Sequence, residues 1–360
     1  MRDGLSKVPT YVAGKPPATK PGIRSFKISS NENPYSTLPE LLAELNFDQI
    51  NRYPDFASTR LTTALSEKFN LPMDNFVCGT GSVGILQQVV QAVANPGDEM
   101  IHAWRSFEAY PIVAPINAVT NVAIPLRADE THDLSAMADA ITDRTRLIFL
   151  CTPNNPTGTA VRASEFEEFF KQVPEHVTVV FDEAYVEFVT DPDVANSLKY
   201  FQQHKNVIVL RTFSKAYGLA GLRVGFAIAH SEMADAIRKC TVPFGVSGIA
   251  EDAAVLALKY EPALMKRVAS IVSERERLVS GLTSQGWKLP DSQANFVWLR
   301  IGDLTPQFTQ ACSEVGLSVR PYGSDGVRIT IGEEEANSRV LEVCGAFFDK
   351  KDRKSTRLNS

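Results

Sequence analysis

The chain has 360 residues, of which 44% are hydrophobic and 22% are charged, and its formal net charge is -5. This mild acidity provides no attractive field for nucleic acid or for an anionic membrane surface, so we expect small-molecule partners. No apolar run reaches the roughly 18 residues that a membrane span needs, and the first residues lack the basic-then-apolar design of a signal peptide.

Cysteine and histidine are used sparingly in this sequence. Five cysteines are scattered without paired spacing, and there are five histidines. Metal sites and disulfide frameworks need such residues in regular clusters, so we expect no metal and no disulfide. Reduced thiols are typical of the cytoplasm, which is the location that we expect.

The chain begins with a segment that carries little hydrophobic periodicity. Residues 1–35 are rich in Pro, Gly and Lys, which predicts an extended N-terminal arm. Asn31-Glu32-Asn33-Pro34 lies near its end, and turn chemistry alone explains that tetrapeptide.

A glycine-rich segment at residues 79–84, Gly-Thr-Gly-Ser-Val-Gly, follows a short strand and opens a helix. The spacing matches the G-x-G-x-x-G pattern of dinucleotide sites. Such a site also needs an acidic residue at the end of a second strand about 20 positions later, whereas Asp98-Glu99 follows a Pro-Gly turn. Because a helix N-terminus favours an anion, we assign Gly81, Ser82 and Val83 to a phosphate group instead.

Three apolar runs further along the chain end in polar residues. Residues 147–151 lead to Asn155, residues 177–181 lead to Asp182, and residues 207–210 lead to Lys215. Apolar strands separated by helical segments predict an α/β fold with a mostly parallel, doubly wound sheet. The carboxyl edge of such a sheet gathers these polar side chains.

Lys215 carries the strongest chemical signal. An amine at the end of a buried strand has a lowered pKa and can condense with an aldehyde. The hydroxyls of Thr212 and Ser214 and the guanidinium of Arg223 suit a phosphate ester. An amine, an aldehyde and a phosphate together indicate pyridoxal phosphate (PLP) held as a Schiff base.

The pattern changes beyond about residue 235. Helical segments near 231–242 and 249–285 and short strands in 293–331 predict a smaller α+β domain. Arg328 alternates with apolar neighbours, so it points away from the core side of its strand. The predicted segments are an N-terminal arm (1–35), a large α/β domain (36–235), a small α+β domain completed by the N-terminal segment (236–348) and a disordered tail (349–360).

The segment 214–223, Ser-Lys-Ala-Tyr-Gly-Leu-Ala-Gly-Leu-Arg, resembles the lysine motif of PLP-dependent aminotransferases of fold type I (class II family). Four motifs match that family in order: Gly-Thr-Gly-Ser, Asn-Asn-Pro-Thr-Gly, Asp-Glu-Ala-Tyr, and Ser-Lys with its downstream Arg. The resemblance extends over residues 5–348 and is strongest to the histidinol-phosphate aminotransferase-like branch. Segments 104–107, 293–298 and 320–323 are most similar to aromatic amino-acid (phenylalanine) aminotransferases. The resemblance implies a seven-stranded sheet.

The resemblance also implies roles for individual residues. Lys215 is expected to hold PLP as an aldimine and to move a proton, while Asp182 keeps the ring nitrogen protonated and Asn155 and Tyr185 hydrogen-bond the 3-oxygen. The remaining cofactor contacts implied are Gly81, Ser82, Val83, Phe107, Thr212, Ser214 and Arg223, with Tyr53 contributed by the second subunit of a homodimer. The implied substrate contacts are Arg328, Asn33, Tyr11, Arg320 and Asn155. Related enzymes often carry acidic residues where Val83 and Gly84 stand, so the phosphate contacts there stay open.

The implied activity is a ping-pong transfer of an amino group between phenylalanine or tyrosine and 2-oxoglutarate. Histidinol-phosphate aminotransferase is the close alternative, because both substrates need an anion clamp. A PLP decarboxylase acting on a phosphorylated amino acid shares the same four motifs and stays open as well.

Overall fold

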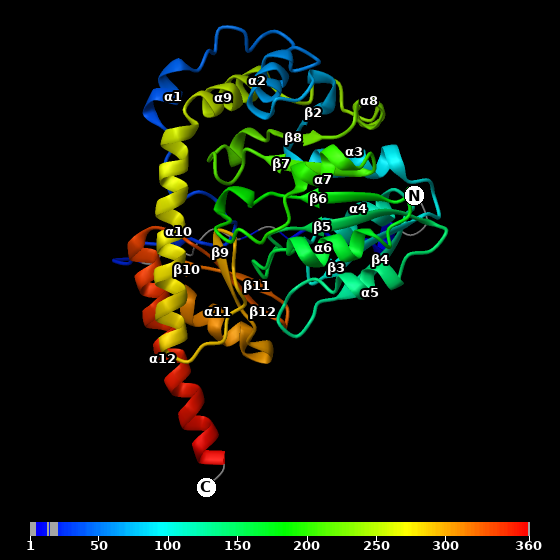
Figure 1. Cartoon of the computed structure of the whole chain (residues 1–360). Coiled ribbons are helices and arrows are strands. Elements are labelled where there is room, and N and C mark those ends of the chain that lie inside the picture. The colour runs from blue at the N-terminus through cyan, green and yellow to red at the C-terminus, as the bar shows by residue number, and fades with distance from the viewer. Residues whose placement is uncertain (1–4, 13, 15–20, 359–360) are drawn as a thin grey trace.

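The computed structural model describes residues 5–12, 14 and 21–358, and a seven-stranded sheet forms its centre (Figure 1). The strand order is β2-β8-β7-β6-β5-β3-β4, in which β8 is antiparallel to both neighbours and the remaining pairs are parallel. The strands are β2 (Phe76–Gly79), β3 (Glu99–Trp104), β4 (Thr120–Pro125), β5 (Thr145–Cys151), β6 (Thr178–Asp182), β7 (Val207–Thr212) and β8 (Gly225–Ile228). The mostly parallel sheet predicted from the sequence is confirmed.

Helices bury both faces of this sheet, because successive side chains of a strand point to opposite sides. On β5, Leu147 and Phe149 pack into one core, and Ile148 and Leu150 pack into the other. One core is covered by α3 (Gly81–Val93), α4 (Tyr110–Ile116) and α8 (Ser231–Lys239). The other is covered by α2 (Thr59–Phe69), α5 (Leu134–Asp139), α6 (Ala163–Phe170) and α7 (Ser197–Gln203).

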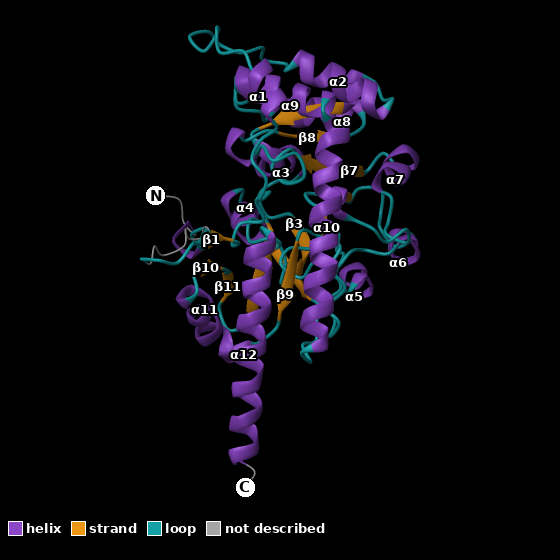
Figure 2. Ribbon diagram, turned by 90° about the vertical axis from the view of Figure 1, so that its left-hand side faces the viewer, coloured by secondary structure: helices purple, strands orange, loops and turns teal. Residues whose placement is uncertain are grey.

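The C-terminal part contains a second, antiparallel sheet of order β11-β12-β9. The N-terminal segment also belongs to this part of the molecule, since β1 (Phe26–Lys27) pairs in parallel with β10 (Leu317–Ser318) in a separate two-stranded sheet. Helices α10 and α12 lie side by side along this part of the molecule (Figure 2). The remaining elements are α1 (Pro39–Glu44), α9 (Gly248–Lys259), α10 (Glu261–Ser284), β9 (Phe296–Leu299), α11 (Thr305–Glu314), β11 (Arg320–Tyr322), β12 (Gly326–Thr330) and α12 (Glu334–Leu358).

Two segments differ from the sequence prediction. The long helix expected over 249–285 is two helices, α9 and α10, divided at Tyr260. Pro262 explains the break, since proline lacks an N–H and is tolerated only in the first turn of a helix. Where the sequence predicted a disordered tail at 349–360, α12 extends to Leu358, and the disorder of the tail stays a prediction. Beyond Gly345 no Pro or Gly interrupts residues of fair helix propensity.

Short 3₁₀ helices connect several elements of the fold. They are Leu5–Lys7, Met73–Asn75, Val186–Phe188, Ala220–Leu222 and Gly302–Leu304. In the described part of the chain, no helix combines the length and the apolar character that crossing a membrane requires.

Candidate active site

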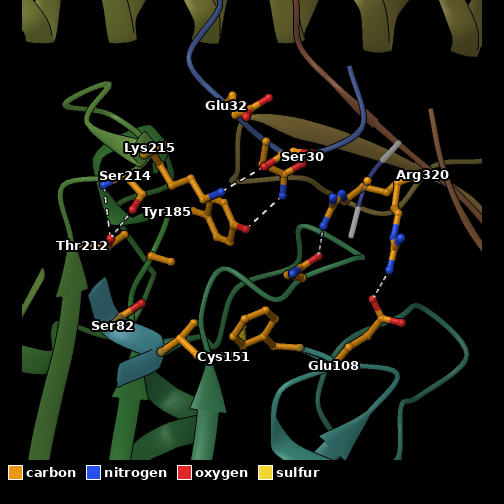
Figure 3. A pocket seen from close by; sticks show the side chains of 18 of the residues that line it. Ser30, Glu32, Ser82, Glu108, Cys151, Tyr185, Thr212, Ser214, Lys215 and Arg320 are labelled. Atoms are coloured by element: carbon orange, nitrogen blue, oxygen red, sulfur yellow. Dashed lines mark hydrogen bonds and ion pairs between the residues drawn. The ribbon is translucent and has the colours of Figure 1, made fainter. Parts of the chain in front are cut away.

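The residues that follow β5, β6 and β7 line one cavity of about 340 Å³ (Figure 3). Asn155 follows β5, Asp182 ends β6, and Lys215 follows β7. Ser82 and Val83 reach it from the first turn of α3, while the second sheet contributes Arg320, Tyr322 and Arg328. The cavity therefore lies at the carboxyl edge of the large sheet, where it meets the smaller one.

Lys215 directs its amine into this cavity. Nζ donates a hydrogen bond to the backbone carbonyl of Ser30 at 3.0 Å and lies 5.9 Å from the centre of the Tyr185 ring. Burial, together with the nearby cations of Arg328 and Arg223, lowers the pKa of the amine to about 7. Near neutral pH a large share of the amine is therefore unprotonated and nucleophilic, as the sequence predicted.

Asp182 is buried at the end of β6 with one carboxylate oxygen unpaired. Oδ2 accepts a hydrogen bond from the Tyr110 hydroxyl at 2.9 Å, while Oδ1 has no partner among the described residues. Burial raises the pKa of this carboxyl to about 6, although the Tyr110 hydrogen bond opposes the change. An unpaired buried anion is unfavourable, so Oδ1 is suited to a cationic N–H donor such as a protonated pyridine nitrogen.

Tyr185 and Asn155 each form buried hydrogen bonds with neighbouring side chains. The Tyr185 hydroxyl accepts a bond from Asn31 Nδ2 at 2.9 Å, and Asn155 Oδ1 accepts bonds from Arg328 and from the Tyr322 hydroxyl. These contacts fix the orientation of the tyrosine ring and of the Asn155 amide. Burial raises the pKa of Tyr185, so its hydroxyl stays protonated as a donor.

An anion cradle lies between the N-terminus of α3 and the segment after β7. Gly81 begins α3 with φ +75°, and a Cβ built there would stand 2.7 Å from Nη2 of Arg223, so the position requires glycine. The Thr212 hydroxyl donates to Ser214 Oγ at 2.9 Å, and Arg223 Nη1 lies 3.4 Å from the same oxygen. Backbone amides, hydroxyls and a guanidinium at one helix N-terminus suit a phosphate.

Two arginines from the second sheet face the cavity with different surroundings. Arg328 is buried, and it donates to Asn155, to the Tyr322 hydroxyl at 3.0 Å and to the Ser29 carbonyl at 2.7 Å. Its Nε has no acceptor among the described residues. Arg320 instead forms an ion pair of 2.6 Å with Glu108.

Two further predicted residues contribute apolar surface. Phe107 lines the cavity, and its ring and that of Tyr110 meet in a T-shaped arrangement with centroids 5.7 Å apart. Tyr11 lines the same cavity from the N-terminal arm and is 55% exposed, so it lies at the mouth.

Three predicted residues lie outside the cavity lining as the structure describes it, namely Gly81, which adjoins the lining at the start of α3, Asn33 and Tyr53. Asn33 Nδ2 donates to the backbone carbonyls of Lys215 and Ala216, at 3.4 and 3.1 Å. Its amide thus holds the backbone of the lysine, and the contact of Asn33 with the substrate stays a prediction. Tyr53 is 83% exposed and stacks on Phe244 with ring centroids 4.7 Å apart.

Several cavity residues had no predicted role. They are Ser29, Ser30, Asn31, Glu32, Glu108, Cys151 and Tyr322. Asn31 and Glu32 belong to the same tetrapeptide as Asn33, and this shared position was a sequence signal that could have placed them at the site. The sequence held no such signal for Glu108, because its partner Arg320 is 212 positions away.

The sequence matches the family model described as aminotransferase class I and II over residues 24–343. It is 54% identical to an aromatic amino acid aminotransferase of Streptomyces avermitilis, over 96% of this chain and 97% of that protein. It is 49% identical to an aromatic amino acid aminotransferase of Thermobifida fusca, again over 96% of this chain and 97% of that protein.

Solved structures agree on the fold. Histidinol-phosphate aminotransferase from Sinorhizobium meliloti, in complex with pyridoxal-5'-phosphate, superposes with a TM-score of 0.85 at 24% identity over 97% of this chain and 98% of that one. Histidinol-phosphate aminotransferase from Clostridium acetobutylicum superposes with a TM-score of 0.80 at 23% identity, over 90% of this chain and 99% of that one. Aminotransferases of class I and II use PLP, so the cofactor expected from the sequence is confirmed. This chain belongs to the aminotransferase class I and II family.

Proposed function

We propose that this chain is an aromatic amino-acid aminotransferase, which exchanges the amino group of phenylalanine or tyrosine with 2-oxoglutarate. The observation that carries the proposal is one cavity that holds both the amine of Lys215, with a pKa of about 7, and the unpaired carboxylate oxygen of Asp182. The relatives from Streptomyces avermitilis and Thermobifida fusca support the aromatic substrate by their names.

The chemistry of the cavity residues fits PLP. A protonated ring nitrogen would supply the donor that Oδ1 of Asp182 lacks among the described residues. Because Gly81 has no Cβ, the space beside Arg223 that a Cβ would fill stays open. The backbone amides of Ser82 and Val83 lie in the first turn of α3 next to this space. We assign the phosphate to this cradle and the ring nitrogen to Asp182.

When bound, PLP supplies an aldehyde that condenses with amines and a ring that accepts electrons. Lys215 Nζ takes the proton from the α-carbon of the amino substrate, and its pKa of about 7 suits both accepting and returning that proton. Asp182 would hold the ring nitrogen in its charged form. Asn155 and Tyr185 would hydrogen-bond the 3-oxygen of the ring, and Phe107 would supply an apolar contact to it. Arg328 binds the substrate carboxylate through its guanidinium fork.

A paired assay tests the substrate assignment. With glutamate as amino donor, purified enzyme is offered phenylpyruvate and imidazole acetol phosphate separately, and kcat/KM is measured for each. We expect phenylpyruvate to be preferred. Preference for imidazole acetol phosphate would support histidinol-phosphate aminotransferase, and carbon dioxide release without oxo-acid formation would support a decarboxylase.

We also propose that the active unit is a homodimer in which Tyr53 reaches the cofactor phosphate of the other subunit. Tyr53 and Phe56 both contact Phe244, yet Tyr53, Phe56 and Phe244 are 83%, 57% and 43% exposed. A contiguous aromatic patch of this kind is typical of a surface that another protein chain covers. Sedimentation should give twice the chain mass. Tyr53→Phe should keep that mass but weaken PLP binding, and a monomeric, fully active enzyme would contradict the proposal.

We propose a cytoplasmic location, supported by five cysteines that are all free. The domain boundary at residues 235 and 236 stays a prediction. So do the individual roles of the site residues.

A further inference from the structure

We propose that Glu108 is a specificity-determining residue, because it neutralises Arg320 and thereby makes one wall of the cavity favour an uncharged aromatic side chain over one that ends in an anion. The inference rests on the proposed function and deepens it. It explains how a cavity that contains four cationic side chains selects a substrate with a single carboxylate.

The Glu108–Arg320 ion pair is part of the cavity wall. Arg320 Nη2 and Glu108 Oε2 are 2.6 Å apart, and the two side chains are 8% and 27% exposed. Both residues line the cavity, and they lie across it from Lys215, Thr212 and Ser214 (Figure 3). The wall that they form is therefore remote from the reacting amine.

Each of the other cations in the cavity has a different assignment. Arg223 borders the phosphate cradle, and Lys215 carries the amine. Arg328 donates its three hydrogen bonds to uncharged oxygens, so its positive charge is not compensated by a carboxylate in direct contact. Arg328 can thus receive the substrate carboxylate, whereas the charge of Arg320 is already compensated.

The neighbours of the pair are aromatic. The Arg320 guanidinium lies 5.4 Å from the centre of the Tyr322 ring, and Phe107 is adjacent to Glu108 in sequence and lines the same cavity. A phenyl or phenol ring would meet these surfaces without disturbing any charge. A substrate whose side chain ends in a carboxylate would bring its negative charge towards Glu108 and would have to displace the Glu108 carboxylate from Arg320.

Stability gives little reason to retain this pair. A largely buried ion pair loses hydration on both partners and is often replaceable by apolar residues without loss of stability. Selectivity gives a stronger reason, since a like charge in a cavity is an effective way to reject an anion. The second carboxylate of 2-oxoglutarate must also compete with Glu108 for Arg320.

The test compares the wild-type enzyme with Glu108→Gln, both loaded with PLP. With tyrosine as donor, the ratio of kcat/KM for 2-oxoglutarate to kcat/KM for phenylpyruvate should rise about 10- to 100-fold, which is the range expected for exposing one charged hydrogen-bond donor. The KM for 2-oxoglutarate should fall. Because both acceptors share one donor, altered tyrosine binding cancels in the ratio.

Two further variants separate selectivity from structure. Glu108→Asp retains the charge and should keep the ratio near the wild-type value. The double variant Glu108→Gln with Arg320→Gln should lose the gain, because the exposed guanidinium is gone. An unchanged ratio in Glu108→Gln, or a parallel loss of activity on both acceptors, would overturn the proposal.

Inorganic phosphate provides a probe that does not depend on turnover. Calorimetry with the PLP-loaded proteins should show tighter phosphate binding by Glu108→Gln than by the wild type, and equal affinity would refute the role of Glu108. If the wild-type enzyme fails to use phenylpyruvate, the proposed function fails, while this binding measurement still decides the role of Glu108.

Discussion

Asp182→Asn is expected to stabilise the cofactor-free protein and at the same time to weaken its hold on PLP. Burial raises the pKa of Asp182 from 3.8 to about 6. That difference corresponds to roughly 3 kcal/mol of unfavourable charge burial. Because the pKa is raised in the folded state, the cost is absent well below pH 3.8 and fully present above about pH 6. Asparagine keeps the shape and can still accept the Tyr110 hydrogen bond without the charge.

Urea unfolding of the cofactor-free proteins, at one fixed protein concentration, measures the first effect. At pH 8 the free energy of unfolding should be higher in Asp182→Asn by up to about 3 kcal/mol, and the gain should shrink as the pH falls through 6. Titration with PLP, followed by absorbance, measures the second effect. Removing one partner of a buried ion pair typically costs about 3 to 5 kcal/mol, so binding should weaken at least about 100-fold.

Glu183→Gln is the matched control. Glu183 is the neighbouring buried carboxylate, but it is paired with Arg211 at 2.9 Å and lies outside the described lining of the cavity. Its replacement should destabilise the protein, because a largely buried arginine loses its partner. Equal PLP affinity in Asp182→Asn and the wild type would refute the placement of the ring nitrogen against Asp182.

Three further predictions follow from the same geometry. The Lys215 amine reacts only when it is unprotonated, and its pKa is about 7. Imine formation between the cofactor-free protein and an added aldehyde, followed by absorbance, should therefore rise with pH around a midpoint near 7, and a midpoint near 10 would contradict the burial argument. Gly81→Ala places a Cβ 2.7 Å from Arg223 Nη2 at a φ of +75°, so the Kd for PLP should increase at least roughly 10-fold. Unchanged affinity for PLP would contradict the assignment of the phosphate to this cradle. Arg328→Lys loses the guanidinium fork, so the KM values for phenylalanine and glutamate should both rise by about 10-fold or more while the PLP absorbance spectrum is retained; unchanged KM values would exclude Arg328 as the carboxylate clamp.

The central sheet and its functional edge were predictable because they depend on local patterns. The apolar runs of β5, β6 and β7 are long enough to indicate buried strands, and parallel strands share a carboxyl edge. Asn155, Asp182 and Lys215 each follow such a run, so their meeting in one cavity could be expected before the fold was known.

Contacts between distant segments could not be predicted in the same way. Asn31 reaches Tyr185 across 154 positions, and Arg320 reaches Glu108 across 212, so neither pair leaves a signal in local sequence. Both depend on how the second sheet packs against the first. The division of α9 from α10 is different, because Pro262 is a local signal that the prediction of one helix over 249–285 left out.

The central claim is that the amine of Lys215 binds the aldehyde of PLP covalently. Reduction of the PLP-loaded protein with sodium borohydride, followed by proteolysis and mass spectrometry of the peptides, tests it directly. We predict a single pyridoxyl phosphate adduct on Lys215. An unmodified Lys215, or an adduct on another lysine, would contradict the claim.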